Sequence, residues 1–304
     1  MKALIDILLD AGFWYSVIRL TTPLLFATMA ALISDKAGVL NIGIEGTMLF
    51  AALMSVFAGA FSHNVWIGVL GGVAAGVLFS LFFCFFCLKM ETDTVLTGIA
   101  LNLLSSALTI FLLDIVTGDR SVSSSLESGT VPYINIPFIE SIPFIGKVIS
   151  GHSALTYIGV LALIALSFFL KRTRMGLYIR AAGQNSDSVE TAGISTNKVR
   201  VCALLLSGIM SGLGGAFMSM SYVSMFSRDM VAGRGFIALA AEAMGHGVPV
   251  VSALSALVFG FADALCNRLQ LFDIPGDLVR SIPYIFTIII LALHSARKLR
   301  KRTA

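Results

Sequence analysis

The sequence predicts an all-α protein, a polytopic bundle of transmembrane helices, and its composition is the first reason. Of its 304 residues, 57% are hydrophobic and only 12% are charged, whereas a soluble domain carries about 25% charged residues. So few charges could not cover the surface of a water-soluble chain of this length, and 22 Phe exclude a disordered one. A lipid membrane is therefore the expected environment. The net charge of +4 comes from basic clusters between apolar segments, so we expect no nucleic-acid partner.

Apolar segments long enough to span a membrane are the second reason, because a spanning helix needs about 20 mostly apolar residues. The candidate spans are residues 16–33, 42–61, 65–88, 94–117, 154–170, 200–222, 236–246, 250–267 and 282–297. We expect about 8–10 spans, including a short or broken helix, in a single transmembrane domain over residues 1–304. The N-terminal run is interrupted by Asp6 and Asp10 and no cleavage site follows, so a secretory signal is not expected.

Two of these segments have irregular, glycine-rich beginnings. The segment 236–246 is short, contains Glu242, and ends at Gly245-His246-Gly247. The segment 42–61 opens with the polar sequence Asn-Ile-Gly-Ile-Glu-Gly over residues 41–46. Broken helices persist at membrane depth only where protein surrounds them or where they line a cavity. We therefore expect 236–246 to be a half-helix or a re-entrant segment.

The orientation follows from Lys and Arg, which concentrate on the cytoplasmic side. The densest basic clusters lie at 171–200 and 297–302. Placing both inside makes 171–200 cytoplasmic and 118–153 exterior, and it requires 236–246 to cross completely. The loop 118–153 contains three prolines among Ile and Phe, so it is expected to form either a structured lid or a docking surface for an external partner.

Small residues recur at helical spacing in two spans. Gly68, Gly72 and Gly76 share one helix face, and Gly208 and Gly212 repeat the pattern. Such spacing lets helix backbones approach closely in lipid. It predicts tight packing within a multi-helix bundle.

No catalytic or metal-binding set of residues is present in the sequence. The four His lie at loops or span ends without metal-ligand spacing, and Cys84-Phe-Phe-Cys87 has no second pair. The chain also lacks the G-x-x-x-x-G-K-[ST] pattern of a nucleotide-binding P-loop. We expect no cofactor, no metal and no enzymatic activity of its own.

The segment 171–200 contains a short helix with its own start and stop signals. Asp187 and Glu190 have the spacing of a capping box, and Gly193 is suited to ending the helix. Its apolar face would consist of Val189, Ala192 and Ile194. A helix of two turns is not stable alone, so it should dock either on the underside of the bundle or on a cytoplasmic partner.

Three separated motifs resemble one family of membrane proteins. They are Arg-Ala-Ala-Gly-Gln-Asn-Ser from residue 180, Gly-Val-Leu-Asn-Ile-Gly-Ile-Glu-Gly over 38–46, and Gly-Phe-Ile-Ala-Leu-Ala-Ala-Glu-Ala-Met-Gly over 235–245. The sequence resembles the ABC importer permeases for branched-chain amino acids, ribose and other simple sugars, and nucleosides. It is most similar to the nucleoside-type permeases that work with basic-membrane-protein-type receptors.

The resemblance implies a permease subunit of an ATP-driven importer in the bacterial cytoplasmic membrane. Such a subunit forms the path for a nucleoside or a related small polar solute, for example a simple sugar. It implies three partners: a separate ABC ATPase subunit, a second permease of the same or a different chain, and an extracytoplasmic solute-binding protein or lipoprotein. The residues that match the ATPase-coupling helix are Gly183, Gln184, Asn185, Asp187, Glu190, Ala192, Gly193 and Ile194.

Four polar residues at the irregular segments are candidates for the substrate path. Ionisable groups within spans are costly unless paired or hydrated, and transporter sites are commonly built at broken helices. The candidates are Asn41, Glu45, Asn102 and Glu242. Their alternative roles are structural: each carboxylate could cap a helix or pair with Arg or Lys, and each Asn could join two helices.

Two other classes of protein compete with the permease. One is a stand-alone transporter driven by ions, in which Glu45 or Glu242 binds the ion; the capped segment near Asp187 counts against it. The other is a membrane-embedded enzyme, which would need clustered catalytic groups that the sequence lacks. The residues do not identify the solute.

Overall fold

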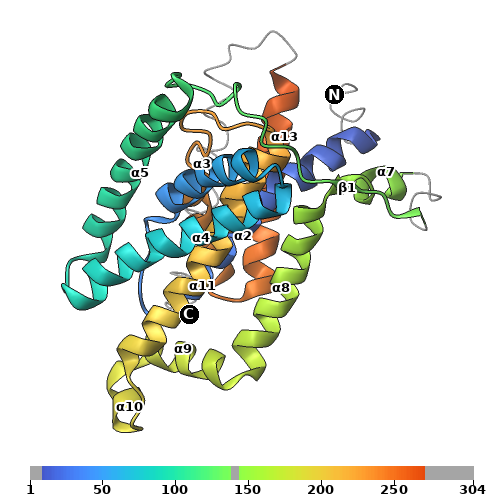
Figure 1. Ribbon diagram of the computed structural model, residues 1–304. Coiled ribbons are helices and arrows are strands. Elements are labelled where there is room, and N and C mark those ends of the chain that lie inside the picture. Colours follow the sequence, from blue (N-terminus) through green and yellow to red (C-terminus); the bar gives the residue numbers. More distant parts are fainter. Residues whose placement is uncertain (1–8, 138–143, 271–304) are drawn as a thin grey trace.

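The computed structural model describes residues 9–137 and 144–270, which form a helical bundle (Figure 1). Within these residues, seven helices are long and apolar enough to cross a membrane. They are α2 (Ala11–Lys36), α3 (Ile44–Ser62), α4 (Val65–Cys84) with its π-helical extension η1 (Phe85–Lys89), α5 (Thr94–Thr117), α8 (Ala154–Arg172), α11 (Thr196–Phe217) with η2 (Met218–Tyr222), and α13 (Pro249–Leu269). The predicted all-α membrane bundle is confirmed, and the predicted span 282–297 lies outside the described residues.

The predicted short helix is α12 (Arg234–Gly245), which has 12 residues. At about 1.5 Å per residue it extends about 18 Å, far less than the ~30 Å of a bilayer core. The preceding loop supplies the remaining length. At one end of the bundle Ser123 donates its N–H to the Phe226 carbonyl at 3.0 Å, and at the other Gly247 contacts the Lys36 side chain. The loop and α12 together therefore make the crossing that neither makes alone.

The centre of the bundle consists of α11 packed against α2, α3 and α4. A Cβ added to Gly76 would lie 2.9 Å from the Gly212 backbone and would also meet the Gly208 carbonyl. A Cβ on Gly212 would in turn lie 2.7 Å from the Val73 Cα. The predicted glycine face is therefore the contact between α4 and α11.

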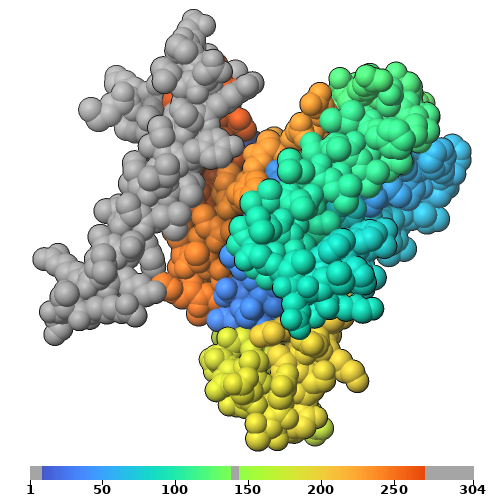
Figure 2. Space-filling model, turned by 90° about the vertical axis from the view of Figure 1, so that its left-hand side faces the viewer, coloured from blue at the N-terminus to red at the C-terminus, as the bar shows by residue number. Residues whose placement is uncertain are grey.

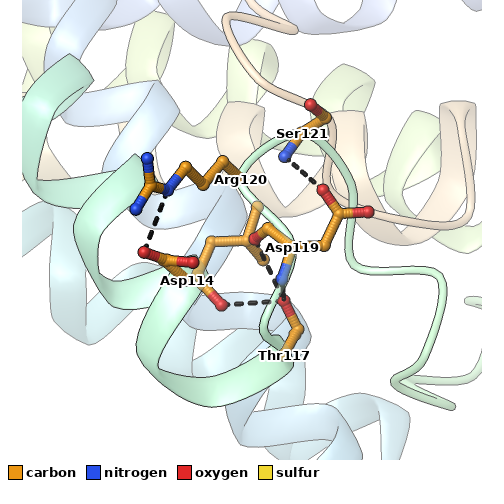
Figure 3. A network of polar contacts seen from close by, with 6 residues as sticks. Asp114, Thr117, Asp119, Arg120 and Ser121 are labelled. Atoms are coloured by element: carbon orange, nitrogen blue, oxygen red, sulfur yellow. Dashed lines mark hydrogen bonds and ion pairs between the residues drawn. The ribbon is translucent and has the colours of Figure 1, made fainter.

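The described parts of 118–153 cover one end of the bundle, as expected for a lid. Val131 is fully buried and donates its N–H to the Met220 carbonyl at 3.0 Å. The strands β1 (Tyr133–Ile134) and β2 (His152–Ser153) pair antiparallel beside α7 (Ile145–Ile149). At the end of α5, Arg120 pairs with Asp114 at 3.0 Å (Figure 3). These contacts hold the lid against the bundle.

Two short helices lie at the opposite end of the bundle from β1 and α7. They are α9 (Arg174–Gln184) and α10 (Ser186–Thr191). They project below the long helices in Figure 1, and they form a separate knob in Figure 2. The segments 118–153 and 171–200 are therefore at opposite ends of α8, which joins them.

Candidate functional site

The predicted short helix in 171–200 exists as α10, but Asn185 caps it. The Asn185 Oδ1 accepts N–H groups from Asp187 at 3.1 Å and from Ser188 at 3.2 Å. The prediction that Asp187 begins the helix in a capping box with Glu190 is therefore wrong, because the helix already starts at Ser186. Gly193 ends the helix as predicted, with φ +78° and its N–H donated to the Glu190 carbonyl at 2.9 Å.

Of the predicted apolar face of α10, Val189 and Ile194 pack against the protein's own bundle, whereas Ala192 is exposed. Val189 is 5% exposed and packs in a cluster with Ile179, Ala182 and Val199. Docking of Val189 on a partner is therefore excluded in this arrangement, since the bundle itself supplies the support that a helix of this length needs. The outward surface of the segment is exposed and mostly polar, and it contains Gly183, Gln184, Asn185, Asp187, Glu190, Ala192 and Gly193. Ile194 is partly buried against the same cluster as Val189.

The knob rests on the turn that joins α2 to α3. The helix α9, which the sequence analysis missed, begins where the Thr173 hydroxyl accepts the Gly176 N–H at 3.1 Å. At its other end, a Cβ on Gly183 would lie 2.9 Å from the Gly38 nitrogen. A polar pocket of about 390 Å³ lies between these parts, lined in part by Asp35, Lys36, Gly38, Arg180, Gly183 and Gln184. The knob is therefore in direct contact with the end of α2.

Two of the candidate path residues brace the start of α3. Asn41 is 2% exposed, and its Oδ1 accepts the Gly43 N–H at 3.0 Å. Asn102 on α5 accepts the Gly46 N–H at 2.8 Å and donates to the Ile42 carbonyl at 3.1 Å. Both amides therefore form hydrogen bonds with backbone groups of the irregular turn. Asn102 also joins α5 to the start of α3, which is the structural role considered for it as an alternative to solute binding.

Glu45 caps α12. Its Oε1 accepts the Gly233 N–H at 2.7 Å, and its Oε2 accepts the Gly235 N–H at 2.6 Å. A carboxylate at this position satisfies unpaired N–H groups and interacts favourably with the helix dipole. The structural alternative for Glu45, a helix cap, is the arrangement observed.

Glu242 lies toward the opposite end of α12 and is 8% exposed. The ionisable side chains of Asp35 and Lys36, at the end of α2, lie near its carboxyl group. The structure thus brings Asn41, Glu45 and Asn102 together around α3, whereas Glu242 lies apart, beside the polar pocket.

A polar group that the sequence analysis missed surrounds Tyr222. Arg19 on α2 donates to the Tyr222 carbonyl at 2.7 Å, and its guanidinium lies 5.1 Å from the centre of the Tyr222 ring. Arg234 at the start of α12 lies 5.9 Å from the same ring. The available signal was Arg19 itself, an isolated charge within a predicted span, which marks either function or a paired interior contact.

Within the described residues, seven helices long enough to span a membrane, a half-helix capped by the Glu45 carboxylate and a helical knob at one end define a multi-pass membrane protein. The fold is similar to that of a solved metal-chelate type ABC transporter in an inward-facing conformation. The TM-score is 0.54 at 16% identity, over 91% of this chain and 85% of the other. Residues 14–292 match the family described as the branched-chain amino acid transport system permease component. The chain belongs to this family.

Two curated relatives align over nearly the whole chain. The nucleoside ABC transporter permease protein NupC of Lactococcus lactis is 34% identical over 90% of this chain and 89% of its own length. The guanosine ABC transporter permease protein NupQ of Bacillus subtilis is 33% identical, over 88% and 87%. The resemblance to ABC permeases, the multi-pass membrane location and the permease function are confirmed, and this family argues against a stand-alone ion-driven carrier. The individual site roles stay predictions.

Proposed function

We propose that this chain forms the translocation path for a nucleoside in an ATP-driven importer. The observation that carries the proposal is the agreement of two relatives, named for nucleoside and guanosine transport, along about 90% of the chain. A simple sugar is the second candidate, because it shares the hydroxyl-rich surface of the ribose.

ATP hydrolysis takes place on a separate ATPase subunit that binds the α9–α10 knob. The exposed polar surface from Gly183 to Gly193 supports this assignment, as does its direct contact with the end of α2 through Gly38. An ATPase can do conformational work only through contacts that differ between two states. Because the knob is packed against the end of α2, a shift of the knob on ATPase binding would also shift the spanning helices.

The remaining assignments follow from the orientation of the protein in the membrane. Residues 1–304 form one permease domain, with 171–200 in the cytoplasm and 118–153 outside. The lid then faces a solute-binding protein or lipoprotein, and a second permease subunit, identical or different, completes the path. The basic residues of 171–200 support this orientation.

Solute uptake tests the proposed substrate. The complete transporter in proteoliposomes, with its receptor and ATPase, should take up radiolabelled uridine or guanosine only when ATP is enclosed. Unlabelled glucose should not compete. If glucose were taken up and neither nucleoside competed with it, the transported solute would be a sugar and not a nucleoside.

Loss of the ATPase tests the coupling surface. Ala192 is exposed, so Ala192→Asp should fold, but it would place a charge in the ATPase contact, where an unpaired charge is costly. We expect the variant to insert normally, to lose copurifying ATPase and to lose uptake. Ser124→Asp, an exposed position in the lid at the opposite end of the bundle, is the matched control and should retain the ATPase. Normal ATPase retention and uptake in Ala192→Asp would contradict the assignment.

The driving force is tested at Glu242. Glu242→Gln keeps the size and hydrogen-bonding capacity of the side chain and removes only its charge, so an ATP-driven permease should retain uptake. An ion-coupled carrier that used this carboxylate would lose uptake while its expression and assembly stayed normal.

A further inference from the structure

Ser106 and Asp229 form a polar contact at the middle of a spanning helix. Ser106 is the thirteenth of the 24 residues of α5, which places it about 18 Å from either end at ~1.5 Å per residue. Its hydroxyl donates to the Asp229 Oδ1 at 2.9 Å. The contact therefore lies near the midplane when α5 spans the bilayer.

The charged side chains at this contact are exposed on the surface of the protein. Arg228 pairs with Asp229 at 3.4 Å, and their side chains are 59% and 56% exposed. Charged groups facing hydrocarbon cost several kcal/mol and almost always face the bundle interior or a water-filled cavity. A half-exposed ion pair at this depth consequently marks a surface in contact with water.

The remaining surface of α5 has the opposite character. Leu103 and Leu96 are each 69% exposed, and Phe111 is 60% exposed, as expected for a helix face in contact with lipid. Ser106 lies to one side of this apolar face, where α5 meets the segment before α12. The two segments lie next to each other in Figure 2, where α5 is teal to green and the segment before α12 is orange. The boundary between lipid and water therefore runs along α5.

The loop that carries Asp229 is fixed at several points. Arg228 donates its N–H to the Ser121 carbonyl at 2.8 Å, and Gly233 donates to Glu45 at 2.7 Å. Asp229 and Ala232 are held at φ +50° and +52°, a left-handed conformation that non-glycine residues rarely adopt. Backbone strain of this kind persists where the surroundings determine the conformation, so Asp229 is presented in a defined place.

We propose that Ser106, Arg228 and Asp229 form a solute-contact site on the aqueous path, specific for a neutral solute with neighbouring hydroxyl groups. This inference rests on the proposed function and names the residues that contact its substrate. The Asp229 carboxylate can accept hydrogen bonds from two solute hydroxyls, and the free N–H groups of the Arg228 guanidinium supply donors. The Ser106 hydroxyl, which donates its own hydrogen to Asp229, can accept a hydrogen bond from the solute. The pair Arg228–Asp229 has no net charge, which suits a neutral ribose diol better than an anion.

Water access is tested first, by cysteine labelling of the complete transporter lacking its four native cysteines. A charged methanethiosulfonate should react at position 229 in Asp229→Cys and at position 106 in Ser106→Cys. Leu103→Cys, on the same helix, is the matched control and should react at least about tenfold more slowly, because a thiol in apolar surroundings does not readily ionise. Positions 229 and 106 reacting as slowly as 103 would overturn the aqueous site. This arm needs no solute, so it stands even if nucleoside uptake is absent.

Recognition of the diol is tested by transport. Wild-type protein should transport uridine in preference to 2′,3′-dideoxyuridine. Asp229→Asn should raise the KM for uridine, so that the ratio of uridine to dideoxyuridine transport falls by about tenfold. Uridine should also slow labelling at position 106. An unchanged preference in Asp229→Asn, with no protection at 106, would overturn the contact site while leaving nucleoside transport intact. Absence of all nucleoside uptake by the wild type would instead refute the proposed function.

Discussion

The carboxylate of Glu45 and the backbone of Gly235 are in direct contact. The Glu45 Oε2 accepts the Gly235 N–H at 2.6 Å, and a Cβ on Gly235 would lie 2.8 Å from the Glu45 Cα. The contact joins the start of α3 to the start of α12. Since α3 follows the turn on which the knob rests, contacts run without a break from the knob through this turn and α3 to the start of α12.

Glu45→Gln should weaken this junction. A carboxylate accepts both N–H groups, whereas an amide presents one acceptor and one NH₂ donor, so one of the two glycine N–H groups loses its partner. We expect the variant to lose about 1–3 kcal/mol of stability. The measurement is thermal aggregation of the detergent-solubilised complex, followed by size-exclusion chromatography.

The matched control is Glu91→Gln, because Glu91 is an exposed residue between α4 and α5. It should leave the aggregation temperature unchanged. Equal temperatures for the two variants and the wild type would show that the bonds from Glu45 add nothing to stability.

Gly76→Ala should separate α4 from α11. The new methyl group would meet the Gly208 carbonyl and the Gly212 backbone, the latter at 2.9 Å, and backbone atoms cannot move aside as a flexible side chain would. Overpacking of this kind costs about 1–3 kcal/mol. Leu70→Ala, on the same helix at a position 65% exposed, should have little effect. The yield of monodisperse protein after heating compares them, and equal yields would count against tight packing at Gly76.

His152 should make the lid sensitive to pH. It is 2% exposed, its Nε2 lies 2.8 Å from the Val148 carbonyl, and its ring stacks on Tyr15 at 4.1 Å. Burial lowers the pKa of His152 below its usual 6.5. At a pH above the usual histidine pKa, His152 is neutral whether the lid is closed or open. As the pH falls through that usual pKa, His152 gains a proton first in the open lid, so the closed lid loses stability.

Hydrogen exchange at Gly151 and Ala154 measures this effect, because their N–H groups bond to the carbonyls of Ile134 and Pro132. After correction for intrinsic rates, protection should fall between about pH 7.5 and about pH 5.5, on either side of the usual histidine range. His152→Phe can keep the ring stacking without a titrating group, and its protection should not vary over that interval. Constant protection in the wild type would contradict the prediction.

Local patterns predicted those parts of the structure that depend on local physics. Apolar length located the spans, and the spacing of Gly68, Gly72 and Gly76 located a helix contact. The stop at Gly193 was also correct, because a left-handed φ of +78° favours glycine locally.

Interactions between distant residues could not be predicted in the same way. Glu45 and Gly233 are 188 positions apart, so the sequence identified a carboxylate within a span but not the helix that it caps. The burial of Val189 depends on where Ile179 and Val199 lie in space. Asp187 and Asn185 are both good caps, and only the actual start of the helix at Ser186 distinguished them.

Gly183→Ala should uncouple ATP hydrolysis from transport. A methyl group at this position would lie 2.9 Å from the Gly38 nitrogen and would meet the Lys36 carbonyl, so α9 would have to move away from the end of α2. The outward surface at Asp187, Glu190 and Ala192 would be unchanged, and the ATPase should therefore still bind. Its motion would reach the spans through a looser contact. We expect the variant to copurify with its ATPase and to hydrolyse ATP, while uptake per ATP falls by about tenfold, as a 1 Å misplacement can change a rate by more than that. Leu177→Ala, on the same helix at a position 54% exposed and outside the surface from Gly183 to Gly193, should keep the wild-type ratio of uptake to hydrolysis. If both variants kept that ratio, the contact between Gly183 and Gly38 would not transmit the motion.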